Sequence, residues 1–307
     1  MRTHCGNSVL LRVFLWVSLI MAASCIPEGE PAIDEASVIA ANASVRADPT
    51  ASSRTLLRLP EGERVDVLGK EGTWYRIRDQ EGFEGWMDES TLIGDSTLER
   101  MEAMLEESRG APVQNSVMTL DAVNLRLEPG RDTAVIRRLR RNVRLEVLDR
   151  LTTPRPDSDA TDIWFRVRTL PSPERQEIGW VFAQLVEFEV PGELRPYTEG
   201  RIYTAVQILD EVVDPVAGQA RWYVVAERRP GAPPGLAFDG IRVFTWNMGA
   251  RRYETSLRLR DLRGSYPLEI TGADPPSFRF HVLDPSGVRQ PREFVMRGSL
   301  ARELGDR

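Results

Sequence analysis

The stretch EGTWYRIRDQEGFEGWM, residues 71–87, places two tryptophans on either side of an alternating run and a glycine-containing turn. In the run WYRIR, period-two alternation puts Tyr75 and Ile77 on one face of a strand and the tryptophan and arginines on the other. Gly85 then permits tight backbone geometry at the start of the next strand. The stretch therefore predicts short β-strands joined by a turn, and it raises the question of whether its tryptophans bind a ligand or only pack.

The same pattern occurs a second time further along the chain. Residues 43–92 contain VRADP, VDVL, WYRIR and GWM, and residues 122–185 contain LRLEP, LEVL, WFRVR and GWV in the same order. Phe165 and Val167 take the places of Tyr75 and Ile77, so the apolar face is kept and is predicted to face a core. The simplest interpretation is a duplicated β module. Wider spacing in the second copy marks insertions at residues 152–161 and 171–177.

Both copies resemble bacterial SH3-like (SH3b) domains, which share the pattern N-V-R-x-x-P, a turn glycine, V-x-V-L, W-x-x-V and G-W-V. The resemblance implies small, partly open β-barrels of roughly five or more strands. The two inserted loops of the second copy depart from the family pattern. We expect the first barrel at residues 41–94 and the second at residues 116–190.

Residues 95–115 lie between the two copies and predict a helical linker. Ser96 with Glu99 fits a capping box, and Leu98, Met101 and Leu105 share one helical face. The helix is either a rigid spacer between the barrels or a helix packed on one of them.

Residues 191–307 contain no third copy but are rich in predicted strands. Turns at residues 247–250 and 284–287 separate pairs of strands, which indicates hairpins. The segment 239–270 resembles the C-terminal part of bacterial SH3-domain lipoproteins, a resemblance that implies no activity. The expected fold class is all-β: two small SH3-like barrels joined by a short helix, followed by a β-sandwich-like C-terminal domain.

The N-terminal segment predicts export. Arg2 and Arg12 precede a short apolar run that ends in small residues, which is typical of a signal peptide at residues 1–24. The sequence LIMAASC, residues 19–25, resembles a bacterial lipobox, although ordinary signal peptidase could also cleave there. Cys5 lies in the removed segment, so Cys25 is the single remaining thiol and its position favours lipidation. Ile26 after the cysteine favours, by the same resemblance, the outer membrane facing the periplasm.

Charge and composition limit the partners. Residues 25–40 are acidic, contain proline and lack aromatic residues, which predicts a lipidated acidic tether. The chain has a formal net charge of −6, so nucleic acid is not an expected partner. The expected partners are a membrane, through lipidated Cys25, and either peptidoglycan or an envelope protein.

The sequence predicts no catalytic, metal or cofactor site. Cell-wall hydrolases, which often carry SH3-like modules, need a Cys–His pair or a zinc ion held by histidines. His281 is the single histidine after residue 24, so a zinc site with several histidines cannot form. Asp157, Asp159 and Asp162 share one loop but depart from the spacing of a calcium-binding loop, which predicts a solvated acidic loop.

Two groups of residues are candidates for ligand binding. A cluster of arginines in the second copy could bind carboxylates or phosphates by forked hydrogen bonds, or could form a solvated turn. Tryptophans at equivalent places in the two copies could line a groove, although shared packing is the commoner role. The candidates are Trp74, Trp86, Arg137, Arg138, Arg140, Arg141, Trp164 and Trp180.

Two function classes remain open. The first is a non-catalytic envelope lipoprotein that binds peptidoglycan or an envelope protein through its SH3-like modules. The second is a structural or assembly subunit of an envelope complex that has no wall ligand. Ligand-dependent burial of Trp74 or Trp164 would favour the first class, and a stoichiometric partner would favour the second.

Overall fold

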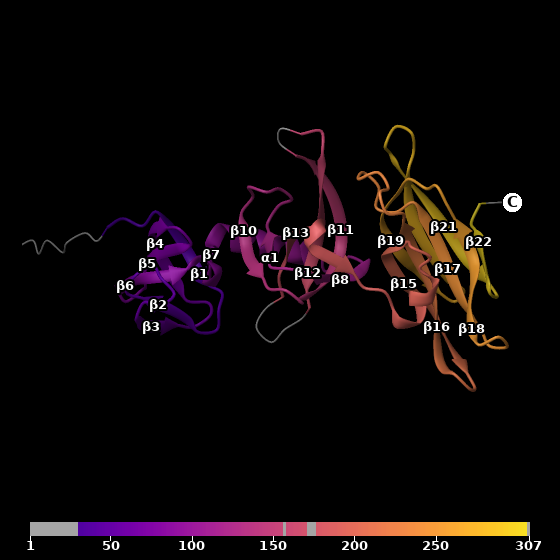
Figure 1. Ribbon diagram of the computed structural model, residues 1–307, viewed down its shortest axis with the longest axis horizontal. Helices are drawn as coiled ribbons and strands as arrows, with labels where there is room; N and C mark the ends of the chain where they lie inside the picture. The colour runs from indigo at the N-terminus through magenta and orange to yellow at the C-terminus, as the bar shows by residue number, and fades with distance from the viewer. Residues whose placement is uncertain (1–29, 156–157, 171–175, 306–307) are drawn as a thin grey trace, which may run out of the picture.

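A computed structural model describes residues 30–155, 158–170 and 176–305 of the chain. Three β-rich bodies follow one another along the long axis of the molecule (Figure 1), and α1 (Asp95–Glu107) is the one α-helix of the described residues. The predicted all-β fold class is confirmed. The predicted signal peptide and Cys25 lie outside the described residues, and within those residues no helix is both long and apolar enough to cross a membrane.

The first body is a seven-stranded sheet with the strand order β3-β2-β6-β5-β4-β1-β7. Its apolar residues form a separate core that includes Val45, Val67, Ile77 and Met87. Its strands are β1 (Asp34–Val38), β2 (Ala43–Arg46), β3 (Thr55–Leu59), β4 (Arg64–Glu71), β5 (Trp74–Arg78), β6 (Glu84–Asp88) and β7 (Leu92–Gly94), with η1 (Glu89–Thr91) before β7.

The second body repeats this topology strand for strand, with the order β10-β9-β13-β12-β11-β8-β14. The irregularity in β4 between Val67 and Gly69 recurs in β11 between Val147 and Asp149. The strands are β8 (Asn115–Thr119), β9 (Val123–Arg126), β10 (Val135–Leu139), β11 (Arg144–Pro154), β12 (Thr161–Thr169), β13 (Ile178–Phe182) and β14 (Val186–Phe188), with η2 (Ala183–Leu185) before β14.

The predicted tether boundary requires a correction. Residues 34–38 were expected in the acidic tether, but they form β1, which pairs with both β4 and β7. Ala36 and Val38 are buried in the first core. The acidic composition of the segment does not indicate a strand, yet its few apolar side chains face the barrel. Strand β8 is the counterpart of β1 in the second barrel.

A close backbone approach explains the glycine of the Gly-Trp motif. A Cβ atom on Gly85 would lie 2.4 Å from Cγ1 of Val45, and one on Gly179 would lie 2.6 Å from the carbonyl oxygen of Arg126. At these points β6 pairs with β2, and β13 pairs with β9. Each of these two strand pairings consists of a single pair of residues. Only a residue without a side chain allows these strands to meet.

Helix α1 packs on the second barrel. Met101 is almost fully buried in the same apolar cluster as Leu125 and Val181, and Leu98 and Leu105 pack against that cluster. The predicted helical face is therefore confirmed, and of the two expected roles the packed helix is the one observed. The predicted capping box is wrong, because the N-cap residue is Gly94 and no side chain caps the helix.

The third body consists of two four-stranded antiparallel sheets, β15-β16-β17-β18 and β19-β20-β21-β22. Their inner faces share one apolar cluster, in which the rings of Phe278, Phe280 and Phe294 stack. The strands are β15 (Ile202–Asp214), β16 (Gly218–Arg228), β17 (Gly240–Asn247), β18 (Arg252–Leu259), β19 (Gly264–Ala273), β20 (Pro276–Leu283), β21 (Arg289–Arg297) and β22 (Leu300–Glu303), and η3 (Gly192–Tyr197) precedes them.

A polar clasp holds the second barrel to this sandwich. Gln114 is fully buried; its side-chain oxygen accepts a hydrogen bond from the Leu268 amide at 2.7 Å, and its backbone oxygen accepts one from Val206 at 2.7 Å. Asn115 donates a hydrogen bond of 2.8 Å to the carbonyl oxygen of Tyr203. The apolar cluster of the second barrel continues into the sandwich around these contacts.

The substitution Gly179→Ala tests the close approach of β13 to β9. The added methyl group would overlap the backbone of Arg126, so we expect a loss of about 1–3 kcal/mol in unfolding free energy. Urea denaturation followed by tryptophan fluorescence measures it. Gly110→Ala is the matched control, because a Cβ there meets nothing within 4 Å. Equal stability of the two variants would contradict the constraint.

Candidate functional site

The four candidate tryptophans divide between the two barrels. Trp164 and Trp180 of the second barrel are 2% and 7% exposed, whereas Trp74 and Trp86 of the first are half-buried. Trp164 donates a hydrogen bond of 3.0 Å to the Thr153 hydroxyl in the inserted hairpin. Packing is therefore the observed role of the second pair. The first pair lies on the outer face of β5 and β6, opposite the buried Ile77 and Met87.

The four candidate arginines do not act as one cluster. Arg137 pairs with the buried carboxylate of Glu177 at 2.7 Å. Arg140 and Arg141 are exposed in the turn between β10 and β11, beside Asn142, whose φ of 62° is left-handed. Arg138 is also exposed, and among the described residues it has no salt bridge. Of the four, Arg138 lines a hollow of the surface and forms no salt bridge with a carboxylate of the described residues.

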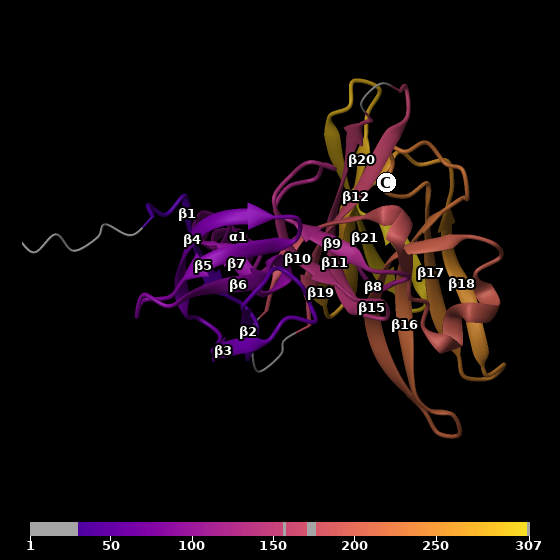
Figure 2. The same cartoon turned by 60° about the vertical axis from the view of Figure 1, so that its left-hand side comes forward.

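A groove of about 620 Å³ runs between the two barrels, and we call it the inter-barrel groove. It separates the first barrel from β10, which lies next to it in Figures 1 and 2. Lys70 bonds to Glu89 at 2.8 Å, a contact that raises the pKa of this lysine, and its ammonium lies 4.8 Å from the centre of the Tyr75 ring. Among the residues that line the groove are Lys70, Tyr75, Asp88, Glu89, Asn124, Val135, Ile136, Arg137 and Arg138.

A smaller pocket of about 240 Å³ adjoins the groove, and we call it the aromatic pocket. Arg138 and Asn124 line both hollows, so the two form one continuous surface. Phe182 supplies its aromatic wall, and the ring of this residue lies 5.4 Å, centre to centre, from the buried ring of Trp164. Arg131 lies over the Phe182 ring at 5.0 Å, and Arg126 also lines the pocket. Desolvation by burial lowers the pKa of the Arg126 guanidinium.

The carboxylate of Asp162 anchors the wall of the aromatic pocket. Arg131 Nε donates to its Oδ2 at 2.6 Å, and Arg155 Nη2 donates to its Oδ1 at 2.8 Å. The hydrogen bonds from Arg131 and Arg155 lower the pKa of this carboxyl to about 2. The prediction that Asp162 belongs to a solvated acidic loop is wrong for this residue, because the side chain is buried and doubly paired. Asp157 lies outside the described residues.

The groove and the pocket are lined by groups that suit contact with a ligand. They offer guanidinium donors, one ammonium, the Asn124 amide and flat aromatic or aliphatic walls, which together suit carboxylates and peptide or sugar groups. In the described part of the chain, no three His, Cys, Asp or Glu side chains gather as metal ligands would. His281 lies on β20 of the sandwich, opposite Ser265 and Pro291.

Several residues of this surface were not singled out from the sequence. They are Lys70, Tyr75, Asn124, Arg126, Arg131 and Phe182. For Phe182 the sequence does contain a signal. The equivalent position of the first copy is Asp88, and this difference between the copies indicates a surface that has diverged. The inter-barrel residues offer no such signal, since their proximity depends on how the two barrels are placed.

Comparison with known proteins supports the barrel assignment for part of the chain. Residues 41–93 match the family model for the bacterial SH3 domain. This segment agrees with the first predicted barrel and spans less than half of the chain. No curated protein matches the chain.

Solved structures give only weak likenesses. NlpC2 from Trichomonas vaginalis is 15% identical with a TM-score of 0.18 over 52% of this chain and 50% of its own, so the chain spans half of that protein. NlpC1 from Trichomonas vaginalis is 11% identical with a TM-score of 0.19, over 84% and 87%. An NlpC/P60 family protein from Bacillus cereus is 13% identical with a TM-score of 0.20, over 84% and 93%. These TM-scores are too low to carry an argument.

The pKa of Asp162 predicts how the second barrel responds to acid. Because folding holds this pKa below its usual value, ionised Asp162 stabilises the fold above about pH 4, and that stabilisation is lost as the pH falls toward about 2. We expect Asp162→Asn to lower the unfolding free energy by about 1–3 kcal/mol at neutral pH. Melting temperatures of both proteins across this pH range measure the effect.

The difference between Asp162→Asn and the wild type should shrink steadily in that acid range. Asp159→Asn, on an exposed residue of the same loop, is the control and should match the wild type at every pH. A difference that is independent of pH would show that the side chain acts by shape rather than by charge.

Proposed function

We propose that this chain is a non-catalytic envelope protein that binds peptidoglycan, or a protein of the envelope, through its SH3-like modules. The observation that carries the proposal is the continuous surface formed by the inter-barrel groove and the aromatic pocket, with Arg138 at their shared edge. The match of residues 41–93 to the bacterial SH3 domain supports the module type. The identical strand order of the second body supports extending that type to it.

The chemistry of the surface fits a peptide that bears carboxylates. Arg138 presents a guanidinium with no carboxylate partner among the described residues, and a forked pair of hydrogen bonds to a carboxylate is the strong interaction open to it. The amide of Asn124 beside it can donate to a peptide carbonyl. Tyr75 and Val135 offer apolar contact for the body of the ligand. The short peptides of peptidoglycan carry such carboxylates along an accessible chain.

A second candidate function is favoured by a different surface. The hairpin of β15 and β16 extends beyond the sandwich (Figure 1), and near its tip Val213 and Val216 are 76% and 66% exposed. Exposed apolar side chains on a projecting hairpin suit contact with another protein. In this alternative the chain is an assembly subunit of an envelope complex and has no wall ligand.

Co-sedimentation with purified sacculi tests the first candidate. We expect the full mature chain to pellet with sacculi at low salt and less at moderate salt, because the contact is electrostatic. Arg138→Ala should weaken binding about tenfold or more, the loss of one charge-assisted contact. Arg141→Ala is the matched control, since that arginine lies in the exposed turn outside both hollows, and it should bind like the wild type.

Two outcomes would overturn wall binding through this surface. One is the absence of sedimentation at either salt concentration, and the other is an equal loss for Arg138→Ala and Arg141→Ala. If sacculi are not bound and a protein co-purifies in a fixed ratio, and Val213→Ser with Val216→Ser releases that protein, the assembly subunit is the function instead.

The proposal places the chain on the periplasmic side of the outer membrane, anchored by Cys25. This part rests on the sequence resemblance, since Cys25 lies outside the described residues. We expect metabolic labelling with a fatty acid to mark the wild-type chain and not Cys25→Ser, which should move to the soluble fraction. Equal labelling of both proteins, or retention of Cys25→Ser in the membrane fraction, would contradict the anchor.

A further inference from the structure

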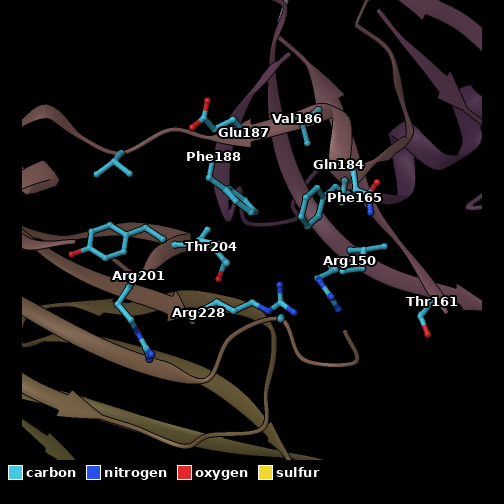
Figure 3. A pocket seen from close by; sticks show the side chains of 16 residues that line it. Arg150, Thr161, Phe165, Gln184, Val186, Glu187, Phe188, Arg201, Thr204 and Arg228 are labelled. Carbon is cyan, nitrogen blue, oxygen red and sulfur yellow. The ribbon is translucent and has the colours of Figure 1, made fainter. Parts of the chain in front are cut away.

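A second cavity lies where the second barrel meets the sandwich, apart from the groove proposed to bind the wall. It has a volume of about 430 Å³, which is within the range of small-molecule sites. Figure 3 shows its side chains, most of which come from β11, β12 and β14 of the barrel and from β15 and β16 of the sandwich. We call it the junction cavity.

Two arginines, one from each body, face each other across the junction cavity. The guanidinium groups of Arg150 and Arg228 point toward one another in Figure 3. Arg150 donates to the carbonyl oxygen of Pro234, and Arg228 Nη2 donates to that of Ala232 at 2.6 Å. The Nε atom of Arg228 is buried and has no hydrogen-bond partner. Burial and the nearby Arg228 lower the pKa of Arg150 to about 10, so Arg150 stays charged at neutral pH.

The carboxylates nearby do not neutralise this pair. Asp239 contributes a favourable charge to Arg228, but its oxygens bond to Arg201 at 2.8 Å and to Arg229 at 2.7 Å. Glu187 also lines the cavity, with its carboxylate directed away from the two guanidinium groups (Figure 3). Two like charges in a partly desolvated site are unfavourable without an anion between them.

The opposite wall of the cavity is apolar. The rings of Phe165 and Phe188 meet edge to face with centres 5.1 Å apart, above the two guanidinium groups in Figure 3. Ile163, Val186 and Ile202 also line the cavity. A cationic end and an apolar wall in one hollow match a ligand with an anionic head and an apolar body.

From this arrangement we infer that the junction cavity binds an anionic amphiphile, with its carboxylate or phosphate head between Arg150 and Arg228 and its apolar body against Phe165 and Phe188. The head forms charge-assisted hydrogen bonds with the two guanidinium groups, and it relieves the repulsion between the two cations. The body displaces water from the aromatic wall. Because the two arginines come from different bodies, the bound ligand also holds the second barrel to the sandwich.

Isothermal titration of the full mature chain tests the inference with four probes that share one alkyl chain: decanoate, decyl phosphate, decanol and decyltrimethylammonium, each below its micelle concentration. We expect at least one of the two anions to bind one to one, decanol to bind at least tenfold more weakly, and the cation not to bind. The stronger of the two anions identifies the head group. Binding should also raise the melting temperature.

Variants separate the binding role of the arginines from a structural one. Arg228→Met should reduce affinity for the anion at least tenfold, whereas Arg228→Lys should retain part of it, because the charge remains. Val190→Trp fills the cavity without removing a charge and should abolish binding while the protein stays folded. Arg289→Met, on an exposed residue of β21, is the matched control and should bind like the wild type.

Three results would overturn the inference. The first is the absence of binding by either anion, and the second is equal affinity for decanol and for the stronger of the two anions. The third is unchanged affinity in folded Val190→Trp. Sedimentation with sacculi is unaffected by these outcomes, since Arg138 and the inter-barrel groove lie outside this cavity, so the two proposals can fail independently.

Discussion

The clasp at Gln114 and Asn115 is the interaction on which the arrangement of the molecule depends. These two side chains join the end of the linker to the sandwich through hydrogen bonds to the backbone of Leu268 and Tyr203. Buried amides are costly to leave without partners, so the clasp specifies one docking geometry as well as holding it. With the barrel docked in this way, residues of β11 and β12 and residues of β15 and β16 line the junction cavity.

The two barrels show how one backbone is adapted to two surroundings. The Gly-Trp motif closes each barrel by the same close approach, yet the residues around it have diverged. In the second barrel α1 packs on the shared apolar cluster, and Trp180 is buried. In the first barrel Trp86 remains half-buried and β1 is built from a segment with acidic residues. The second barrel therefore shares the large apolar cluster of the molecule, whereas the first barrel has a core of its own.

Charge pairing decides which arginines are available to a ligand. Arg131 and Arg155 are held by Asp162, and Arg137 by Glu177, so their charges are already compensated. Arg138 on the groove has no such partner among the described residues. In the sequence these residues look alike, because their carboxylate partners are distant along the chain. Charge counts alone could predict a basic segment but could not identify the side chain that faces a hollow.

The β class, the repeated strand pattern and the packed face of α1 could be predicted from the sequence alone, because period-two and helical spacing are local patterns that do not depend on which segments pack together. It could not reveal β1, whose pairing with β4 and β7 outweighs an acidic composition. The packing of Trp164 under an inserted hairpin, and the cavity that Arg150 and Arg228 share, became visible in the folded chain and not before. Both features depend on contacts between segments that are far apart in the chain, and a local sequence pattern does not indicate which segments are in contact.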